Sequence, residues 1–301
     1  FTCLFLCVGF KAKSQVHPID GAALHYRLIG FTFPVHEKAT GYRLEIFEYS
    51  SNPNGDTQFR KVVTQEEQDS KIIATVPAFG KNYMWQVKYL KKRKLLGSTA
   101  RNFFSVNANP FSGADVSRVM IIDSASKYKD LLLFFDNTRT LHNMAGEPLW
   151  YLPVIKGISD GNAGNIRDIK MTADGTITFL TTKNIHEIDY YGNVLWSSPN
   201  DGKVSGDTVE QYHHEFTKLS NGNYMVIANK LVPSQSIENN SSPKVENGSK
   251  LPCGTIVEYN SRKEIVWTWN SCDYIKMGDP TTHFNSFYFD EQNKVFYTSY
   301  R

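Results

Sequence analysis

The segment 282–301 holds the side chains whose types and spacing best suit chemistry. It reads THFNSFYFDEQNKVFYTSYR, with His283 and Asn285 near its start and Arg301 at its end. The β-forming residues between them predict a strand hairpin, in which His283 and Asn285 share a face and Arg301 returns towards them. An imidazole, an amide and a guanidinium together suit an oxyanion that gains or redistributes charge.

A second candidate lies in an earlier segment, 213–230, which reads HHEFTKLSNGNYMVIANK. Here His214 stands near a strand start, and His213 is the adjacent alternative. We interpret His142 and His186 as structural, because each lies inside a hairpin and away from a strand start. The competing interpretation of every candidate is structural, since a lone histidine usually satisfies a backbone carbonyl.

The elements that position these side chains repeat along the chain. A strand, a turn and a tryptophan-bearing strand recur, at 140–153, 185–199 and 256–270. A second hairpin alternates with this unit, at 167–183, 213–230 and 283–301. Four strands in each repeat predict the blades of a β-propeller, whose innermost strands line a central channel and would bring His214 and His283 together.

The spacing of the tryptophans agrees with this fold. Trp150 and Trp196 are 46 residues apart, and a propeller blade takes about 40 to 50 residues. Trp267 follows Trp196 by 71 residues, and a polar insertion around 233–250 accounts for the excess. Residues 108–301 therefore predict about four blades of an incomplete propeller. We expect the recorded sequence to be truncated at both ends.

Residues 16–107 predict a separate β-sandwich of the immunoglobulin or fibronectin III type. Short β-forming runs at 42–49 and 71–76 are bounded by glycine, proline and asparagine clusters. The aromatic alternation at 83–90 is followed by a polar turn, as in the late strands of such sandwiches.

The apolar start of the chain, residues 1–14, reads as the remnant of a secretory signal with cleavage before Gln15. A buried first strand is the alternative. Cys253 and Cys272 lie outside this leader and bracket two strand-like runs joined by a polar turn. A hairpin would bring both to its open end, which predicts a disulfide in an oxidising compartment, against two separate buried thiols.

Composition excludes several classes of function. The 33 basic and 30 acidic residues leave a net charge of +3, too small to indicate a nucleic-acid partner. No segment after the leader reaches the roughly 20 apolar residues that span a bilayer, so we expect no membrane partner. The sequence has no HExxH motif, no closely spaced cysteine pair and no EF-hand spacing, so we expect no metal and no cofactor.

Taken together, these motifs resemble the bacterial arylsulfate sulfotransferases, or arylsulfotransferases. The match is most specific at H-x-N-S followed by an arginine, which fits His283, Asn285 and Arg301. It continues in the H-E-x5-N-G-N pattern at 214–223 and in the repeated strand-turn-tryptophan units. The similarity covers most of residues 108–301, and an immunoglobulin-like domain before the propeller also fits the family.

The resemblance implies a periplasmic, six-bladed propeller, usually a homodimer, that moves a sulfuryl group from a phenolic sulfate ester to a phenol. It implies independence of the nucleotide sulfate donor PAPS and a histidine that becomes transiently sulfated. In the family, other histidines, an asparagine and an arginine hold the sulfuryl oxygens and assist the phenolic oxygen. The residues that match these roles here are His214, His283, Asn285 and Arg301. The nucleophile is expected in a later blade, beyond residue 301.

Two other classes of function remain open. One is a secreted sandwich-propeller that binds a glycan or an aryl ligand without chemistry. A full-length gene that lacks a later histidine motif of the same type would favour it. The other is a quinone-dependent dehydrogenase, which also uses tryptophan-rich propeller repeats, but its calcium ligands and cofactor-stacking residues are not evident in the sequence.

Overall fold

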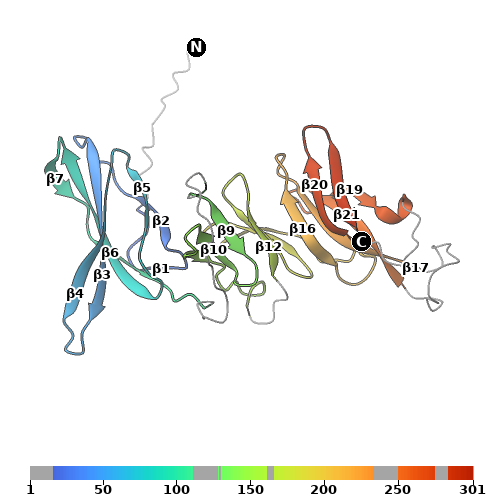
Figure 1. The fold of residues 1–301 in the computed structure, drawn as a ribbon, viewed down its shortest axis with the longest axis horizontal. Helices are drawn as coiled ribbons and strands as arrows, with labels where there is room; N and C mark the ends of the chain where they lie inside the picture. Colours follow the sequence, from blue (N-terminus) through green and yellow to red (C-terminus); the bar gives the residue numbers. More distant parts are fainter. Residues whose placement is uncertain are drawn as a thin grey trace, which may run out of the picture. The chain divides into compact units, whose positions relative to one another are not determined.

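The computed structural model describes residues 16–110, 128, 130–160, 166–233, 250–274 and 284–300. These residues form small, mostly antiparallel β-sheets together with a short 3-10 helix, η3 (Ser271–Asp273), as Figure 1 shows. The all-β prediction is therefore confirmed. Within the described ranges, no helix is long and apolar enough to cross a membrane. The predicted secretory segment, residues 1–14, lies outside the described residues.

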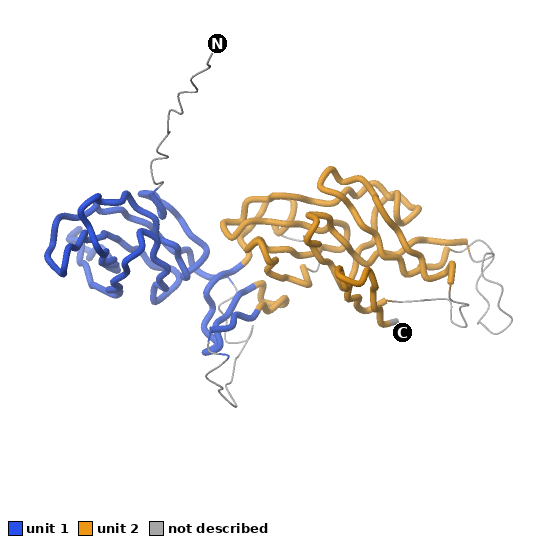
Figure 2. The backbone as a smooth tube through the Cα atoms, turned by 90° about the horizontal axis from the view of Figure 1, so that it is seen from above, with its two compact units in different colours: residues 1–133, 140–151 blue, residues 134–139, 152–301 orange. Residues whose placement is uncertain are grey.

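The chain divides into two compact units, drawn in different colours in Figure 2. The first comprises Phe1–Leu133 and Thr140–Tyr151, and the second comprises Phe134–Arg139 and Leu152–Arg301. The candidate site residues that the structure describes belong to the second unit.

In the first unit, the strands before residue 110 form two sheets. The larger has the order β1-β8-β6-β3-β4 with β7 also paired to β6, and the smaller pairs β2 with β5. On β6, Tyr83, Trp85 and Val87 are fully buried, as the aromatic alternation predicts. The bounds are β1 (Ala22–Leu24), β2 (Leu28–Thr32), β3 (Gly41–Ser51), β4 (Thr57–Glu67), β5 (Lys71–Thr75), β6 (Lys81–Lys91), β7 (Lys94–Ser98) and β8 (Asn102–Val106).

From residue 132 onwards the chain forms a series of hairpins. The sheets have the orders β11-β10-β9, β12-β13-β14-β15, β16-β17-β18-β19 and β20-β21. The predicted tryptophan hairpins and the hairpins that alternate with them are all present. The bounds are β9 (Leu132–Phe135), β10 (Thr140–Asn143), β11 (Pro148–Tyr151), β12 (Arg167–Met171), β13 (Ile177–Leu180), β14 (Ile185–Ile188), β15 (Val194–Ser197), β16 (Tyr212–Lys218), β17 (Tyr224–Pro233), β18 (Lys250–Tyr259), β19 (Ile265–Asn270), β20 (Phe284–Asp290) and β21 (Val295–Tyr300).

The second strand of the β16–β19 sheet, β17, is apolar on both faces and is covered on both. On one face Val226 lies in a core cluster with Leu180 and Trp196 of the β12–β15 sheet. On the other face Ile227 lies in a cluster with Phe284 of β20. Neighbouring residues of a strand point to opposite faces, so this alternation stacks three consecutive sheets of the second unit face to face.

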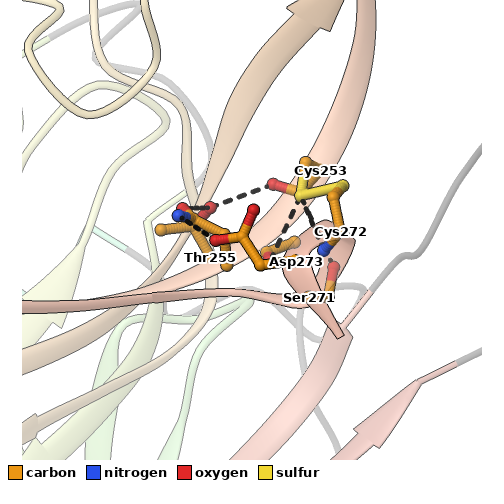
Figure 3. Close-up of a disulfide and its surroundings, with 7 residues drawn as sticks. Cys253, Thr255, Ser271, Cys272 and Asp273 are labelled. Atoms are coloured by element: carbon orange, nitrogen blue, oxygen red, sulfur yellow. Dashed lines mark hydrogen bonds between the residues drawn. A yellow bond between two sulfur atoms is a disulfide. The ribbon is translucent and has the colours of Figure 1, made fainter. Parts of the chain in front are cut away.

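A disulfide joins Cys253 on β18 to Cys272 in η3, as Figure 3 shows. The pairing of Thr255 with Asn270 holds the open end of the β18–β19 hairpin together, which leaves the two cysteine Cα atoms 5.9 Å apart. The backbone N–H of Cys272 also donates a 3.2 Å hydrogen bond to Sγ of Cys253. The disulfide predicted from the sequence is therefore present, at the open end of the β18–β19 hairpin.

Candidate functional site

The candidate residues that the structure describes lie on the first strands of neighbouring sheets. His213 and His214 lie on β16, and Asn285 lies on β20. The two strands approach each other in the second unit, as Figure 1 also shows. His283 and Arg301 lie outside the described residues. The structure therefore places β16 and β20 side by side, with a candidate imidazole on one and a candidate amide on the other.

The two adjacent histidines of β16 have different surroundings. His213 is buried, with Nε2 3.1 Å from the side-chain oxygen of Asn229 on β17. His214 is partly exposed and has a φ of 58°, in the left-handed region. Their rings meet edge to face with centroids 5.1 Å apart. This geometry favours His214 over His213 as the residue that contacts a ligand.

The first strands β12, β16 and β20 each contain an irregularity in their pairing with the second strand of the sheet, before the hairpin turn. In β12 the register shifts between Arg167 and Lys170, and in β20 it shifts next to Asn285. In β16 it shifts between Tyr212 and Phe216, the stretch that contains the two histidines. Such bulges re-aim side chains and are common beside functional sites.

Carboxylates link the first strands of neighbouring sheets. Asp136, which follows β9, accepts hydrogen bonds from the backbone N–H groups of Asp168 (2.7 Å) and Ile169 (3.0 Å) on β12. In the same way, Asp168 accepts a 2.8 Å hydrogen bond from the backbone N–H of Phe216 on β16. These bonds give carboxylate acceptors to backbone N–H groups at the irregular starts of β12 and β16.

A lysine lies between two carboxylates beside these bonds. Nζ of Lys170 is 2.9 Å from Asp168 and forms a short ion pair with Glu215 on β16. Burial is the largest influence on Asp168 and raises its pKa to about 6, with Glu215 adding to the rise and Lys170 opposing it. The cluster joins β12 to β16 at Glu215, the residue that follows His214 in the sequence.

A second buried group lies between the same two sheets. Glu187 on β14 accepts hydrogen bonds from the hydroxyl of Tyr224 (2.5 Å), Nζ of Lys218 (2.9 Å) and the hydroxyl of Thr176 (2.6 Å). Burial acts to raise the pKa of Glu187, but these hydrogen bonds outweigh it and hold that pKa below its usual value. This carboxylate is fully engaged and serves the packing of the sheets.

The two histidines interpreted as structural have internal partners. His142 lies 2.8 Å through Nε2 from the hydroxyl of Thr140, and Nδ1 of His186 lies 2.8 Å from the hydroxyl of Ser197. In the part of the chain that the structure describes, no group of three or more histidine, cysteine, aspartate or glutamate side chains is arranged to hold a metal ion.

Sequence reasoning missed the cluster around Lys170. A signal was present, because Asp168 and Glu215 stand at matching distances before the turns of two repeated hairpins. Hairpin patterns show which strands pair within a sheet, but they do not show which side chains meet between neighbouring sheets.

Comparisons with known proteins bear on the family of the chain. No curated protein matches it. Among solved structures, the exotype rhamnogalacturonan lyase YesX is similar at 11% sequence identity with a TM-score of 0.25. That match covers 84% of this chain and 41% of the lyase chain.

The arylsulfotransferase (ASST) family model matches residues 99–300. This match spans more than half of the chain and includes the paired hairpins, the carboxylate links and the candidate residues on β16 and β20. The chain therefore belongs to the arylsulfotransferase family.

Proposed function

We propose that this chain belongs to an enzyme that transfers a sulfuryl group from a phenolic sulfate ester to a phenol, independently of PAPS. The observation that carries this proposal is the family match over residues 99–300, which includes His214 and Asn285 on adjacent first strands. The proposed location is the periplasm, with the apolar leader as its export signal, and the proposed assembly is a homodimer.

The proposed architecture is a β-propeller, six-bladed as in the family, that begins near residue 108 after a β-sandwich at 16–107. Two observations support it. The β12–β15 and β16–β19 sheets are each four-stranded with their strands in chain order, as in propeller blades. The β12–β15 sheet also packs face to face with the β16–β19 sheet, which packs on its other face against β20–β21, and in a propeller β12, β16 and β20 would be the successive inner strands.

In this arrangement the inner strands carry the sulfuryl-binding groups. His214 and Asn285 are proposed to bind the sulfuryl oxygens, together with His283 and Arg301. An arginine offers a fixed fork of donors to an anionic oxygen, and an asparagine adds a neutral donor. A histidine, with an ordinary pKa near 6.5, can donate to the departing phenolic oxygen at neutral pH.

The proposed reaction has two steps. In the first, the lone pair of a neutral histidine nitrogen attacks sulfur, the sulfur–oxygen bond to the aryl group breaks, and its electron pair leaves on the phenolic oxygen, which takes a proton from a site histidine. In the second, an acceptor phenol gives its proton to that histidine, its oxygen attacks sulfur, and the nitrogen–sulfur bond breaks. None of the described residues is assigned as the nucleophile.

Transfer of sulfate from 4-nitrophenyl sulfate to phenol by the full-length protein tests the proposal. We expect release of 4-nitrophenol together with an equal amount of phenyl sulfate. Binding of 4-nitrophenyl sulfate without turnover would favour the ligand-binding alternative. Release of 4-nitrophenol without phenyl sulfate would indicate hydrolysis and would contradict the proposed transfer.

A further inference from the structure

We propose that Arg167, at the start of β12, is a further sulfuryl-binding residue, acting with His214 and Asn285 from a third inner strand. This inference rests on the proposed function, because it assigns Arg167 to the same site. It would extend the anion-binding set to one residue from each of three successive first strands.

The hairpin turns show that Arg167 and His214 occupy equivalent places. The turn after β12 closes with the N–H of Thr172 donating to the carbonyl of Thr176 at 2.8 Å. The turn after β16 closes in the same way, with Leu219 donating to Asn223 at 2.8 Å. Arg167 lies five residues before Thr172, and His214 lies five residues before Leu219.

The partner strands give the same alignment. Arg167 is paired with Leu180 on β13. His214 lies between the residues paired with Val226 and Ala228 on β17, and so lies opposite Ile227. Leu180 lies four residues after Thr176, and Ile227 lies four residues after Asn223. On β20, Asn285 also lies at an interruption of the pairing, between Phe284 and Ser286, one residue before the position that matches Arg167 and His214.

Side-chain contacts also join β12 to β16 near Arg167 and His214. Asp168 accepts the 2.8 Å hydrogen bond from the backbone N–H of Phe216, and Lys170 forms its ion pair with Glu215. Asp168 and Glu215 directly follow Arg167 and His214 in the sequence, and their partners Phe216 and Lys170 lie within three residues of these two positions. These bonds hold the starts of β12 and β16 side by side.

The side chain of Arg167 has an unsatisfied hydrogen-bond donor. Its Nε–H is buried and has no hydrogen-bond partner among the residues that the structure describes. Arg27, a buried arginine of the first unit, is different: its Nε donates to the carbonyl of Val76 at 2.8 Å and its Nη1 to that of Pro148 at 3.0 Å. The guanidinium of Arg27 is thus satisfied by backbone carbonyls, whereas Nε of Arg167 is not.

An anionic oxygen is the acceptor that best fits such a donor. A guanidinium presents adjacent N–H groups that match two oxygens of a sulfate or phosphate group. A sulfate ester has three non-bridging oxygens to bind, and an arginine on a third strand can bind an oxygen that His214 and Asn285 leave exposed. The residue type and its open donor therefore agree with a role in binding the sulfuryl group.

The test compares three variants of the full-length protein: Arg167→Gln, Arg167→Lys and the control Arg262→Gln. Arg262 lies in the β18–β19 turn and pairs with Glu264, with 77% of its side chain exposed. Two quantities are measured: the inhibition constant of inorganic sulfate against 4-nitrophenyl sulfate, and the sulfate-dependent rise in melting temperature.

We expect Arg167→Gln to raise the inhibition constant of sulfate about tenfold, the effect of losing roughly one hydrogen bond to a charged group. The Michaelis constant for the aryl sulfate donor should rise by a similar factor. Arg167→Lys should restore part of the affinity, and Arg262→Gln should match the wild type. The rise in melting temperature caused by phenol, the uncharged acceptor, should not change. A folding defect would alter the response to both ligands, whereas loss of an anion ligand alters only the response to sulfate.

The outcomes separate this inference from the proposed function. If the wild type transfers sulfate and Arg167→Gln keeps its affinity for sulfate, the inference is overturned and the proposed function stands. If the wild type shows no transfer but sulfate raises its melting temperature through Arg167, the proposed function fails and the anion site stands. If Arg167→Gln does not fold, an unchanged sulfate affinity in Arg167→Lys would overturn the inference, because a lysine lacks the adjacent N–H donors of a guanidinium. No effect of sulfate on the wild type in either measurement would also overturn it.

Discussion

The carboxylate of Asp168 accepts a 2.8 Å hydrogen bond from the backbone N–H of Phe216 and thereby links β12 to β16. It does so in a buried setting that raises the pKa of Asp168 to about 6. The burial of the carboxyl group that aligns these two strands therefore makes the stability of this unit depend on pH.

Asp168→Asn should remove that dependence. The folded-state pKa of about 6 lies above the ordinary value of 3.8, so the contribution of Asp168 is fully present below pH 3.8 and is lost as the pH rises through 6. Relative to the variant, the wild type should lose up to about 3 kcal/mol of unfolding free energy across this range. Urea unfolding at several pH values between about 3 and 7 measures the difference. A wild type that gains relative stability with rising pH would contradict this account.

His186 should show the opposite pH dependence. Burial, with a smaller effect of Lys263, lowers the pKa of His186 to about 4 from 6.5. Its neutral form therefore contributes stability above pH 6.5 that is lost as the pH falls through 4. His186→Asn keeps a hydrogen-bonding group near Ser197 but does not titrate, so the wild type should lose up to about 3 kcal/mol relative to it on acidification. The same urea series serves as the measurement, and parallel pH curves for the two proteins would rule out a buried neutral imidazole.

Reduction of the disulfide should destabilise the protein. Cys253 and Cys272 are separated by 19 residues in sequence, and opening a loop of this size costs about 3 kcal/mol through the entropy of the unfolded chain. Thermal unfolding with and without a reductant measures the effect. The double variant Cys253→Ser with Cys272→Ser should melt like the reduced wild type and should not respond to the reductant. Equal melting temperatures of the oxidised and reduced wild type would count against a stabilising bond.

Loss of a proposed sulfuryl ligand should impair transfer in the full-length enzyme. Removing one donor to a developing oxyanion costs about 3 to 4 kcal/mol, a loss of roughly a hundredfold or more in turnover. His214→Ala, His283→Ala and Arg301→Ala should each show a loss of this order with 4-nitrophenyl sulfate and phenol. Lys92→Ala, in a turn of the first unit, is the control and should leave transfer unchanged. Near-normal rates in all three site variants would end the assignment.

Much of the fold after residue 132 was accessible from the sequence. The hairpins around Trp150, Trp196 and Trp267 combine apolar alternation with polar turns, and these local signals determine which strands pair. The closeness of Cys253 and Cys272 follows from one such hairpin. What connects the sheets could not be inferred in this way, because the contact between Lys170 and Glu215, for example, depends on packing and not on local pairing.

The candidate site was less predictable than the hairpins. The sequence left His213 and His214 as alternatives, because strict alternation of side chains fails where a strand bulges, and β16 bulges at these residues. Sequence reasoning also concentrated on histidines as reactive groups and passed over Arg167. The open donor of that residue becomes visible only when the burial of its Nε is known.

The apolar character of both faces of β17 has a consequence for the order in which the protein is assembled during synthesis. Val226 is covered by Leu180, which is made earlier, whereas Ile227 is covered by Phe284, which is made later. One face of this strand can therefore be buried as soon as it is made, but the other must stay open until β20 and β21 have followed. During that interval the nascent chain exposes an apolar strand face, which is the kind of surface that aggregates or recruits a chaperone.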